Sequence, residues 1–137
     1  MDTKFSVAIH ILIMISESTH QLTSQDIASS VQTNASYIRK IISLLKKANL
    51  LVRYTGSFEY ALGKSKKEMT LFDIYKAVHT DTLLYTHQHA NKQCPVGNCI
   101  YDVLHPIMFN AEKALEQYLS SKTLHDVIED IMNMSNT

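Results

Sequence analysis

The sequence predicts a mainly α-helical chain with one small β-hairpin and a long helix towards its C-terminus. Apolar residues recur at helical spacing along most of the chain, and only three glycines and two prolines interrupt it. Two runs rich in Leu, Val, Tyr and Phe flank Thr55-Gly56-Ser57, a pattern typical of a hairpin. With 137 residues, 45% of them hydrophobic, the chain can form one compact domain, or a small domain plus an oligomerisation element.

Charge is divided unevenly between the two halves of the chain. Residues 1–67 hold nine Lys and Arg against four Asp and Glu, and residues 68–137 hold four against nine. The formal net charge of zero therefore conceals a half at +5 and a half at −5. A basic half indicates a polyanionic partner on the N-terminal side. Scattered surface charge is the alternative.

The first helix is expected at residues 4–18, which are apolar all round and therefore buried. The apolar run at 7–15 contains His10 and is about half as long as a membrane span. It also lacks a basic leader and a small-residue cleavage site, so we expect neither a signal peptide nor membrane insertion. Two cysteines do not make a secreted disulfide framework. We expect a cytoplasmic protein with reduced thiols.

Three later helices begin with the same signature, a Thr followed three residues later by an Asp. The pairs are Thr23/Asp26, Thr70/Asp73 and Thr123/Asp126. In each pair the hydroxyl can accept a hydrogen bond from an unpaired backbone N–H, and the carboxylate lies where the helix dipole favours it. We interpret all three pairs as helix caps without a further function.

Residues 24–48 have the pattern of a helix-turn-helix. A short helix at about 24–31 turns Ile27, Ala28 and Val31 inwards, and Asn34 then caps a second helix that runs to about Ala48. The buried stripe of the second helix is Ile38, Ile41, Ile42 and Leu45. Asn49 ends it, because Asn tolerates the left-handed conformation. Ordinary helical hairpins share this pattern, so the pattern alone is weak evidence for a helix-turn-helix.

Polar and basic residues lie off that stripe or at its edge, as in a helix that enters the major groove of DNA. Arg39 can bind a guanine edge or a phosphate, and Lys40 a phosphate. The start of the preceding helix can hold a backbone phosphate. A solvated polar helix face is the alternative. The candidate DNA-binding residues are Ser24, Gln25, Asn34, Ser36, Tyr37, Arg39, Lys40, Lys47 and Arg53.

A hairpin directly after a helix-turn-helix is a wing. Arg53 lies in its first strand, and Lys64, Lys66 and Lys67 follow its second. These residues are expected to supply positive charge to neighbouring phosphates or to the minor groove.

The order and spacing of five segments resemble the Rrf2 family of winged-helix bacterial regulators over nearly the whole chain. The segments are KFSVAIHIL, TSQDIASSVQTNASYIRKIISLLKKANLL, MTLFDIYKAVH, CPVG and KTLHDVIEDI. The resemblance implies a dimeric DNA-binding repressor or activator. It places the winged DNA-binding domain at 1–67, and a linker helix, a cysteine loop and the dimerisation helices at 68–137.

Two departures from the family pattern matter. Many relatives carry Arg-Gly and then Gly-Gly-Tyr in the wing, where this chain has Thr55-Gly56 and Phe58-Glu59-Tyr60. Arg53 is the available substitute for the missing arginine. Cluster-binding relatives have three cysteines before the long helix, and this chain has two, Cys94 and Cys99. We therefore expect no cofactor, with an iron–sulfur or metal-responsive regulator as the alternative.

The acidic half independently predicts a homodimer. From Ile100 onwards, apolar residues repeat at spacings of three and four and form a stripe with little other core to meet. The stripe is Val103, Leu104, Ile107, Met108, Ala111, Ala114, Leu115, Tyr118 and Leu119. Pro106 is expected to kink or interrupt this helix. Packing of the stripe against the first helix is the alternative.

The remaining chemistry lies in and after the loop before the long helix. His87, His89, Cys94, Cys99 and His105 could bind a metal, but Cys-x4-Cys is not a standard zinc spacing. Cys94 precedes Pro95, which suits the first position of a helix, so its thiolate would be favoured there and a redox role follows. Ordinary part-buried cysteines are the alternative. A cysteine–histidine enzyme and a module that uses its helix-turn-helix for protein contacts alone are the other classes, and we expect no enzyme.

Overall fold

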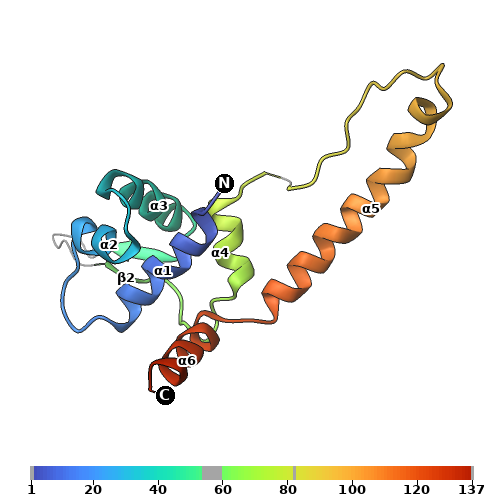
Figure 1. The fold of residues 1–137 in the computed structure, drawn as a ribbon. Helices are drawn as coiled ribbons and strands as arrows, with labels where there is room; N and C mark the ends of the chain where they lie inside the picture. Colours follow the sequence, from blue (N-terminus) through green and yellow to red (C-terminus); the bar gives the residue numbers. More distant parts are fainter. Residues whose placement is uncertain (1, 54–59, 82, 137) are drawn as a thin grey trace.

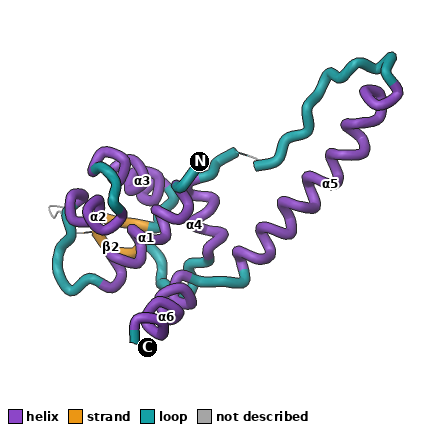
Figure 2. Tube along the Cα trace, viewed as in Figure 1, coloured by secondary structure: helices purple, strands orange, loops and turns teal. Residues whose placement is uncertain are grey.

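The computed structural model describes residues 2–53, 60–81 and 83–136 (Figure 2). Within these ranges the chain forms, in order, α1 (Lys4–Glu17), α2 (Ser24–Val31), α3 (Ala35–Lys47), β1 (Leu51–Arg53), β2 (Tyr60–Leu62), α4 (Leu71–Val78), α5 (Pro95–Ser120) and α6 (Leu124–Ser135). The predicted fold class, mainly α with a small hairpin wing and a long helix near the C-terminus, is confirmed. No helix in the described part of the chain is long and apolar enough to span a membrane.

We call the packed unit of α1–α4, the hairpin and α6 the body (Figure 1). Helix α1 lies at its centre and contacts α2, α3, α4, β2 and α6. All four residues of the stripe predicted for α3 are buried in its core. The core residues of the first four helices are Val7, Ala8, Ile11, Leu12, Ile27, Ala28, Ile38, Ile41, Ile42, Leu45, Ile74, Ala77 and Val78.

The helix ends in the body follow the local sequence signals. The three Thr/Asp pairs form complete capping boxes at the starts of α2, α4 and α6. After α3, Asn49 takes a left-handed backbone conformation with φ of 62°, as predicted. Gly63 follows the hairpin so closely that a Cβ there would lie 2.1 Å from the Asn49 carbonyl oxygen. Glycine is therefore required where the hairpin rejoins the end of α3.

The two strands form an antiparallel pair with Leu51 opposite Leu62 and Arg53 opposite Tyr60. Leu51 is buried, and it anchors the first strand to the core. The predicted turn at Thr55-Gly56-Ser57 lies outside the described residues. The base of the wing is thus fixed by the body.

Helix α6 follows α5 in the chain and packs against the other elements of the body. Thr70 and Thr123 pair as an isolated antiparallel bridge, and the Leu124 N–H donates to the Met69 carbonyl at 2.9 Å. Leu124 and Ile128 are then buried with the residues of α1 and α4. The core therefore combines residues from before and after position 67.

Helix α5 projects away from the body, and the segment that precedes it runs outwards beside it (Figure 1). It begins with Cys94 as its N-cap and Pro95 in its first turn, and it continues through Pro106 to Ser120. The predicted interruption at Pro106 is therefore wrong. Pro106 and Asp102 are exposed, so water can satisfy the carbonyl that the proline leaves unpaired. Helix α5 contacts α4 of the body.

Candidate nucleic-acid interface

The turn between α2 and α3 is held by backbone geometry and one side chain. Gln32 ends α2 with a left-handed φ of 66°, and its N–H donates to the Ala28 carbonyl at 2.8 Å. The Asn34 side-chain oxygen then accepts from the Tyr37 N–H at 2.8 Å and caps α3. Asn34 is therefore the N-cap of α3, and it is exposed to solvent. These features fix the direction in which α3 leaves α2.

The side of α3 away from its buried stripe is polar and basic. Ser36, Arg39, Lys40 and Lys47 are all exposed. One guanidinium nitrogen of Arg39 donates to the Ser36 hydroxyl at 3.2 Å. Ser36 thus steers Arg39 along the helix, and the other guanidinium N–H groups can bind a base edge or a phosphate. The sequence predicts the exposure of these residues, because they lie on the opposite side of the helix from the buried stripe or at its edge.

Tyr37 has a different environment from its neighbours. It is half-buried, packs against the core, and its hydroxyl lies 3.5 Å from the Thr3 hydroxyl before α1. Tyr37 therefore joins the start of α3 to the start of α1.

The start of α2 offers Ser24, half-buried, and Gln25, exposed. The backbone N–H of Thr23, and then its hydroxyl, hold the pKa of Asp26 below its usual value. Asp26 is therefore charged at neutral pH and opposes a phosphate at this helix start. The exposed Gln25 side chain is the better donor towards a DNA backbone.

Three cations near the wing have neighbours within the protein. The Arg53 guanidinium carbon lies 5.7 Å from the centroid of the Tyr60 ring. Lys64 pairs with Asp73 of α4 at 3.2 Å, and Lys66 pairs with Glu17 of α1 at 3.1 Å. Carboxylates thus balance the positive charge of Lys64 and Lys66, which we expected to contact DNA. Lys67 is exposed. Spacing alone could not reveal pairs so distant in sequence.

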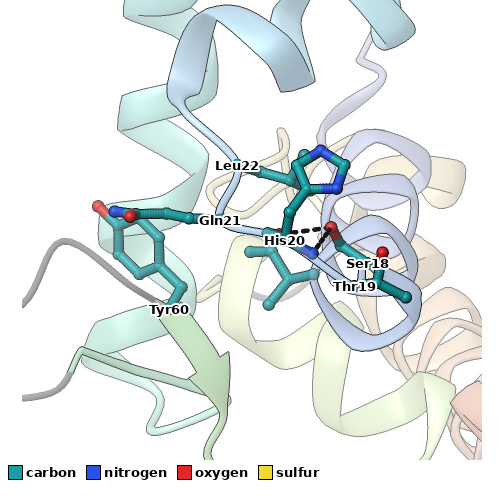
Figure 3. Close-up of a pocket in the computed structure, with 7 residues that line it drawn as sticks. Ser18, Thr19, His20, Gln21, Leu22 and Tyr60 are labelled. Carbon is teal, nitrogen blue, oxygen red and sulfur yellow. Dashed lines mark hydrogen bonds between the residues drawn. The ribbon is translucent and has the colours of Figure 1, made fainter.

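A cavity of about 210 Å³ lies beside the wing, between the α1–α2 loop and β2 (Figure 3). Its polar lining includes Ser18, His20, Gln21 and Tyr60. The Ser18 hydroxyl accepts from the His20 N–H at 3.2 Å, which holds the loop in a tight turn. Sequence reasoning did not predict this cavity, although the polar run at 18–21 marks a loop between the first two helices.

The cysteine segment shows one perturbed thiol. The backbone N–H groups of Gly97, and then of Val96, lower the pKa of Cys94. Cys94 and Cys99 are both exposed, and the ring of His105 stacks on Tyr101 with centroids 5.0 Å apart. Backbone amides, and no histidine, therefore favour the Cys94 thiolate.

The described residues do not provide a metal site. Nowhere in residues 2–53, 60–81 and 83–136 do three His, Cys, Asp or Glu side chains gather closely enough to hold a metal ion. One chain supplies two cysteines, fewer than the three of the cluster-binding relatives and fewer than the four thiolates that typically hold an iron–sulfur cluster. The donor set of this chain therefore does not fit a cluster.

Seven residues of the apolar stripe are the predicted dimerisation residues, and they lie on two neighbouring sides of α5. Val103, Ile107 and Tyr118 are 57%, 56% and 64% exposed, and form what we call the outer stripe. The half-buried residues are Leu104, Met108 and Leu115, whereas Ala111 is exposed. The apolar outer stripe therefore remains uncovered in the single chain.

A helix-turn-helix with a basic outer face, followed by a hairpin, defines a winged helix-turn-helix DNA-binding protein. Residues 1–130 match the sequence profile of the Rrf2 family, which is described as an iron-dependent transcriptional regulator. The chain belongs to this family, and it is a DNA-binding transcriptional regulator rather than an enzyme.

Three individual proteins are similar to this chain over almost its whole length. The chain is 36% identical over 132 residues to the HTH-type transcriptional regulator YwnA of Bacillus subtilis (strain 168), with 96% of this chain and 98% of the relative covered. The crystal structure of a protein described as DNA-binding shares 38% identity and a TM-score of 0.76, covering 91% of this chain and 98% of that one. A transcriptional regulator from Lactobacillus plantarum shares 26% identity and a TM-score of 0.79, with 96% and 91% covered.

Proposed function

We propose that this protein binds an inverted-repeat operator in double-stranded DNA as a homodimer, and thereby represses or activates transcription. Residues 1–67 carry the DNA contacts, while 68–137 supply the linker helix, the cysteine loop and the dimerisation helices. The two ranges divide the roles and are not separately packed domains, because residues of α4 and α6 lie in the same core as those of α1–α3. The protein would work in the cytoplasm, where its DNA partner lies.

The observation that supports the DNA contacts best is the exposed basic side of α3. Arg39 is assigned to a base edge, and Lys40 and Lys47 to phosphates. Ser36 positions Arg39, at 3.2 Å from its guanidinium. The remaining candidates contact the backbone around them: Ser24, Gln25, Asn34 and Tyr37 from the helix starts, and Arg53 from the wing.

The experiment compares Arg39→Ala with Lys47→Ala on a duplex selected by the unmodified protein. Loss of a base contact should cost about 1–3 kcal/mol of binding free energy and relax the preference at one position. Loss of a phosphate contact should weaken all sequences alike and flatten the salt dependence. Unchanged affinity in both variants would refute the assignment of α3 as the recognition helix.

The uncovered outer stripe of α5 supports the homodimer. Three large apolar side chains, each more than half exposed, are costly to leave in water, and a two-fold interface covers the same stripe on both copies. Two-fold symmetry then requires half-sites about one helical turn apart, or a multiple of it.

The lowered pKa of Cys94 favours a second role, regulation by oxidation. A thiolate is the form that peroxide attacks, which gives a sulfenic acid at Cys94. A thiol of Cys99, of a small molecule or of the other subunit then resolves it as a disulfide, with release of water. Operator binding titrated with hydrogen peroxide should change in the native protein and not in Cys94→Ser. An equal response of the two proteins would exclude this thiol. Because the two cysteines do not fit a cluster, we assign no step to iron.

A further inference from the structure

A cavity of about 240 Å³ lies between α4, residues 79–81 and 83, and α5. Phe72 and Tyr75 of α4, Leu83, and Leu115 of α5 form its apolar walls. At 100° per residue, Leu115 lies about a quarter turn around α5 from the outer stripe. A second copy on that stripe therefore need not fill the cavity. The volume is below the 300–1,000 Å³ of typical drug-sized pockets, so it suits a small molecule.

The charges around this cavity favour a cation. Three carboxylates, those of Asp81, Glu112 and Glu116, line it together with the ammonium of Lys76. The acidic side chains of the lining therefore outnumber the basic ones. An anionic ligand would meet net repulsion, and a cation net attraction.

One ammonium already occupies the aromatic wall. The Lys76 ammonium nitrogen lies 4.9 Å from the centroid of the Phe72 ring, and the ring of Phe72 stacks on that of Tyr75 with centroids 6.3 Å apart. This is the geometry of a cation–π contact. Lys76 thus serves as an internal example of the group that the wall accepts, a primary ammonium.

Two polar groups beside the cavity can respond to a ligand. The backbone N–H of Leu84 donates to a Glu112 carboxylate oxygen at 2.8 Å, which ties the chain just after the cavity lining to α5. The Tyr75 hydroxyl is sealed from solvent and has no hydrogen-bond partner among the described residues. Burial, and then the charge of Glu112, raise the pKa of Tyr75, so the hydroxyl stays neutral and its oxygen can accept.

We propose that this cavity binds a small primary amine with a short apolar body. The ammonium group replaces that of Lys76 on the Phe72 ring and donates to Glu112, and the apolar body packs on Leu83 and Leu115. Leu84 then gives up its bond to Glu112. Because residues 79–94 join α4 of the body to α5, binding changes how the body is held on α5 and hence the affinity for DNA. This last step rests on the proposed function.

The test of the site uses the full-length protein without DNA. Butylamine and its neutral analogue butan-1-ol are titrated by NMR and calorimetry. Saturable binding of butylamine alone is expected, about tenfold or more weaker in Glu112→Gln, since a charge-assisted hydrogen bond is lost. Lys76→Met removes the competing ammonium and should bind more tightly. Asp102→Asn removes a carboxylate of the same helix outside this cavity and should bind as the native protein does.

The site is overturned if butylamine does not bind, if butan-1-ol binds equally, or if Glu112→Gln binds with native affinity. Circular dichroism confirms that each variant is folded, and Glu116→Gln replaces Glu112→Gln if the latter does not fold. A DNA titration with and without saturating butylamine tests the coupling, with a change of roughly 5- to 150-fold expected. Binding without such a change overturns the coupling alone, and failure to bind DNA without amine overturns the proposed function alone.

Discussion

Helices α3 and α5 are both amphipathic, but their apolar sides have different fates. The stripe of α3, which includes Ile38 and Ile41, is completely covered by its own chain. On α5 the outer stripe is more than half exposed, and Leu119 is the buried residue among those described. A periodic stripe therefore shows that a helix has an apolar side, without showing which molecule covers it. In α3 the polar side stays exposed, and in α5 the apolar side.

The same contrast appears where the helices begin. In the body, α2, α4 and α6 start with capping boxes, in which a threonine hydroxyl accepts from a backbone N–H. Helix α5 starts at Cys94, whose side chain makes no such cap. The helix starts in the body thus contribute to stability. The start of α5 instead presents an exposed thiol.

The largest effect is expected for Ile41→Ala in the core of the body. This side chain is fully buried, so its truncation should lower the free energy of unfolding by about 2–5 kcal/mol. Tyr85→Ala, at a 69% exposed side chain before α5, should change it by no more than about 0.5 kcal/mol. Urea unfolding at one fixed protein concentration measures both. Similar losses would mean that the body is not the stable unit.

The next effect concerns association through α5. Ile107→Asp places a charge in the proposed apolar interface and should weaken dimerisation by at least about 2 kcal/mol, while circular dichroism stays unchanged. Light scattering across a dilution series measures the dissociation constant. Gln117→Glu adds a charge beside the outer stripe and should leave that constant almost unchanged. Equal dimerisation of all three proteins would place the interface elsewhere.

A smaller effect is expected at the thiol of Cys94. In Cys99→Ser this is the one cysteine left, and its alkylation by iodoacetamide should reach half its maximal rate at a pH below about 8.5, the usual thiol pKa. The direction follows from the lowered pKa, because the thiolate is the reactive form and persists to lower pH. In urea the midpoint should return to the usual value. The same midpoint in both conditions would remove the basis for a thiol switch.

Features set by neighbouring residues could be predicted from the sequence. The bounds of α2 and α3, the three capping boxes, the left-handed Asn49 and the N-cap at Cys94 each depend on a few consecutive side chains and their backbone. The family resemblance supplied the order of the parts. The exposed candidates on α3 followed from its buried stripe.

Features that depend on distant residues could not be predicted. Lys66 pairs with Glu17 across 49 positions, and α6 returns to the core beside α4 through Thr123 and Leu124. Tyr37 is half-buried because the residues before α1 lie beside it. Pro106 was expected to kink or interrupt its helix. Helix α5 continues through it, because solvent around α5 makes the lost hydrogen bond tolerable. Each case is decided by what surrounds the residue in three dimensions.

The central claim is that one body reads one half-site and that α5 brings two bodies to one operator. The most direct measurement is the mass of the complex, by analytical ultracentrifugation, on a selected duplex and on the same duplex with one half-site scrambled. We predict that selection yields an inverted repeat, that two chains bind it, and that scrambling one half weakens binding by more than tenfold. One chain on an asymmetric site, with unchanged affinity after scrambling either flank, would contradict the account.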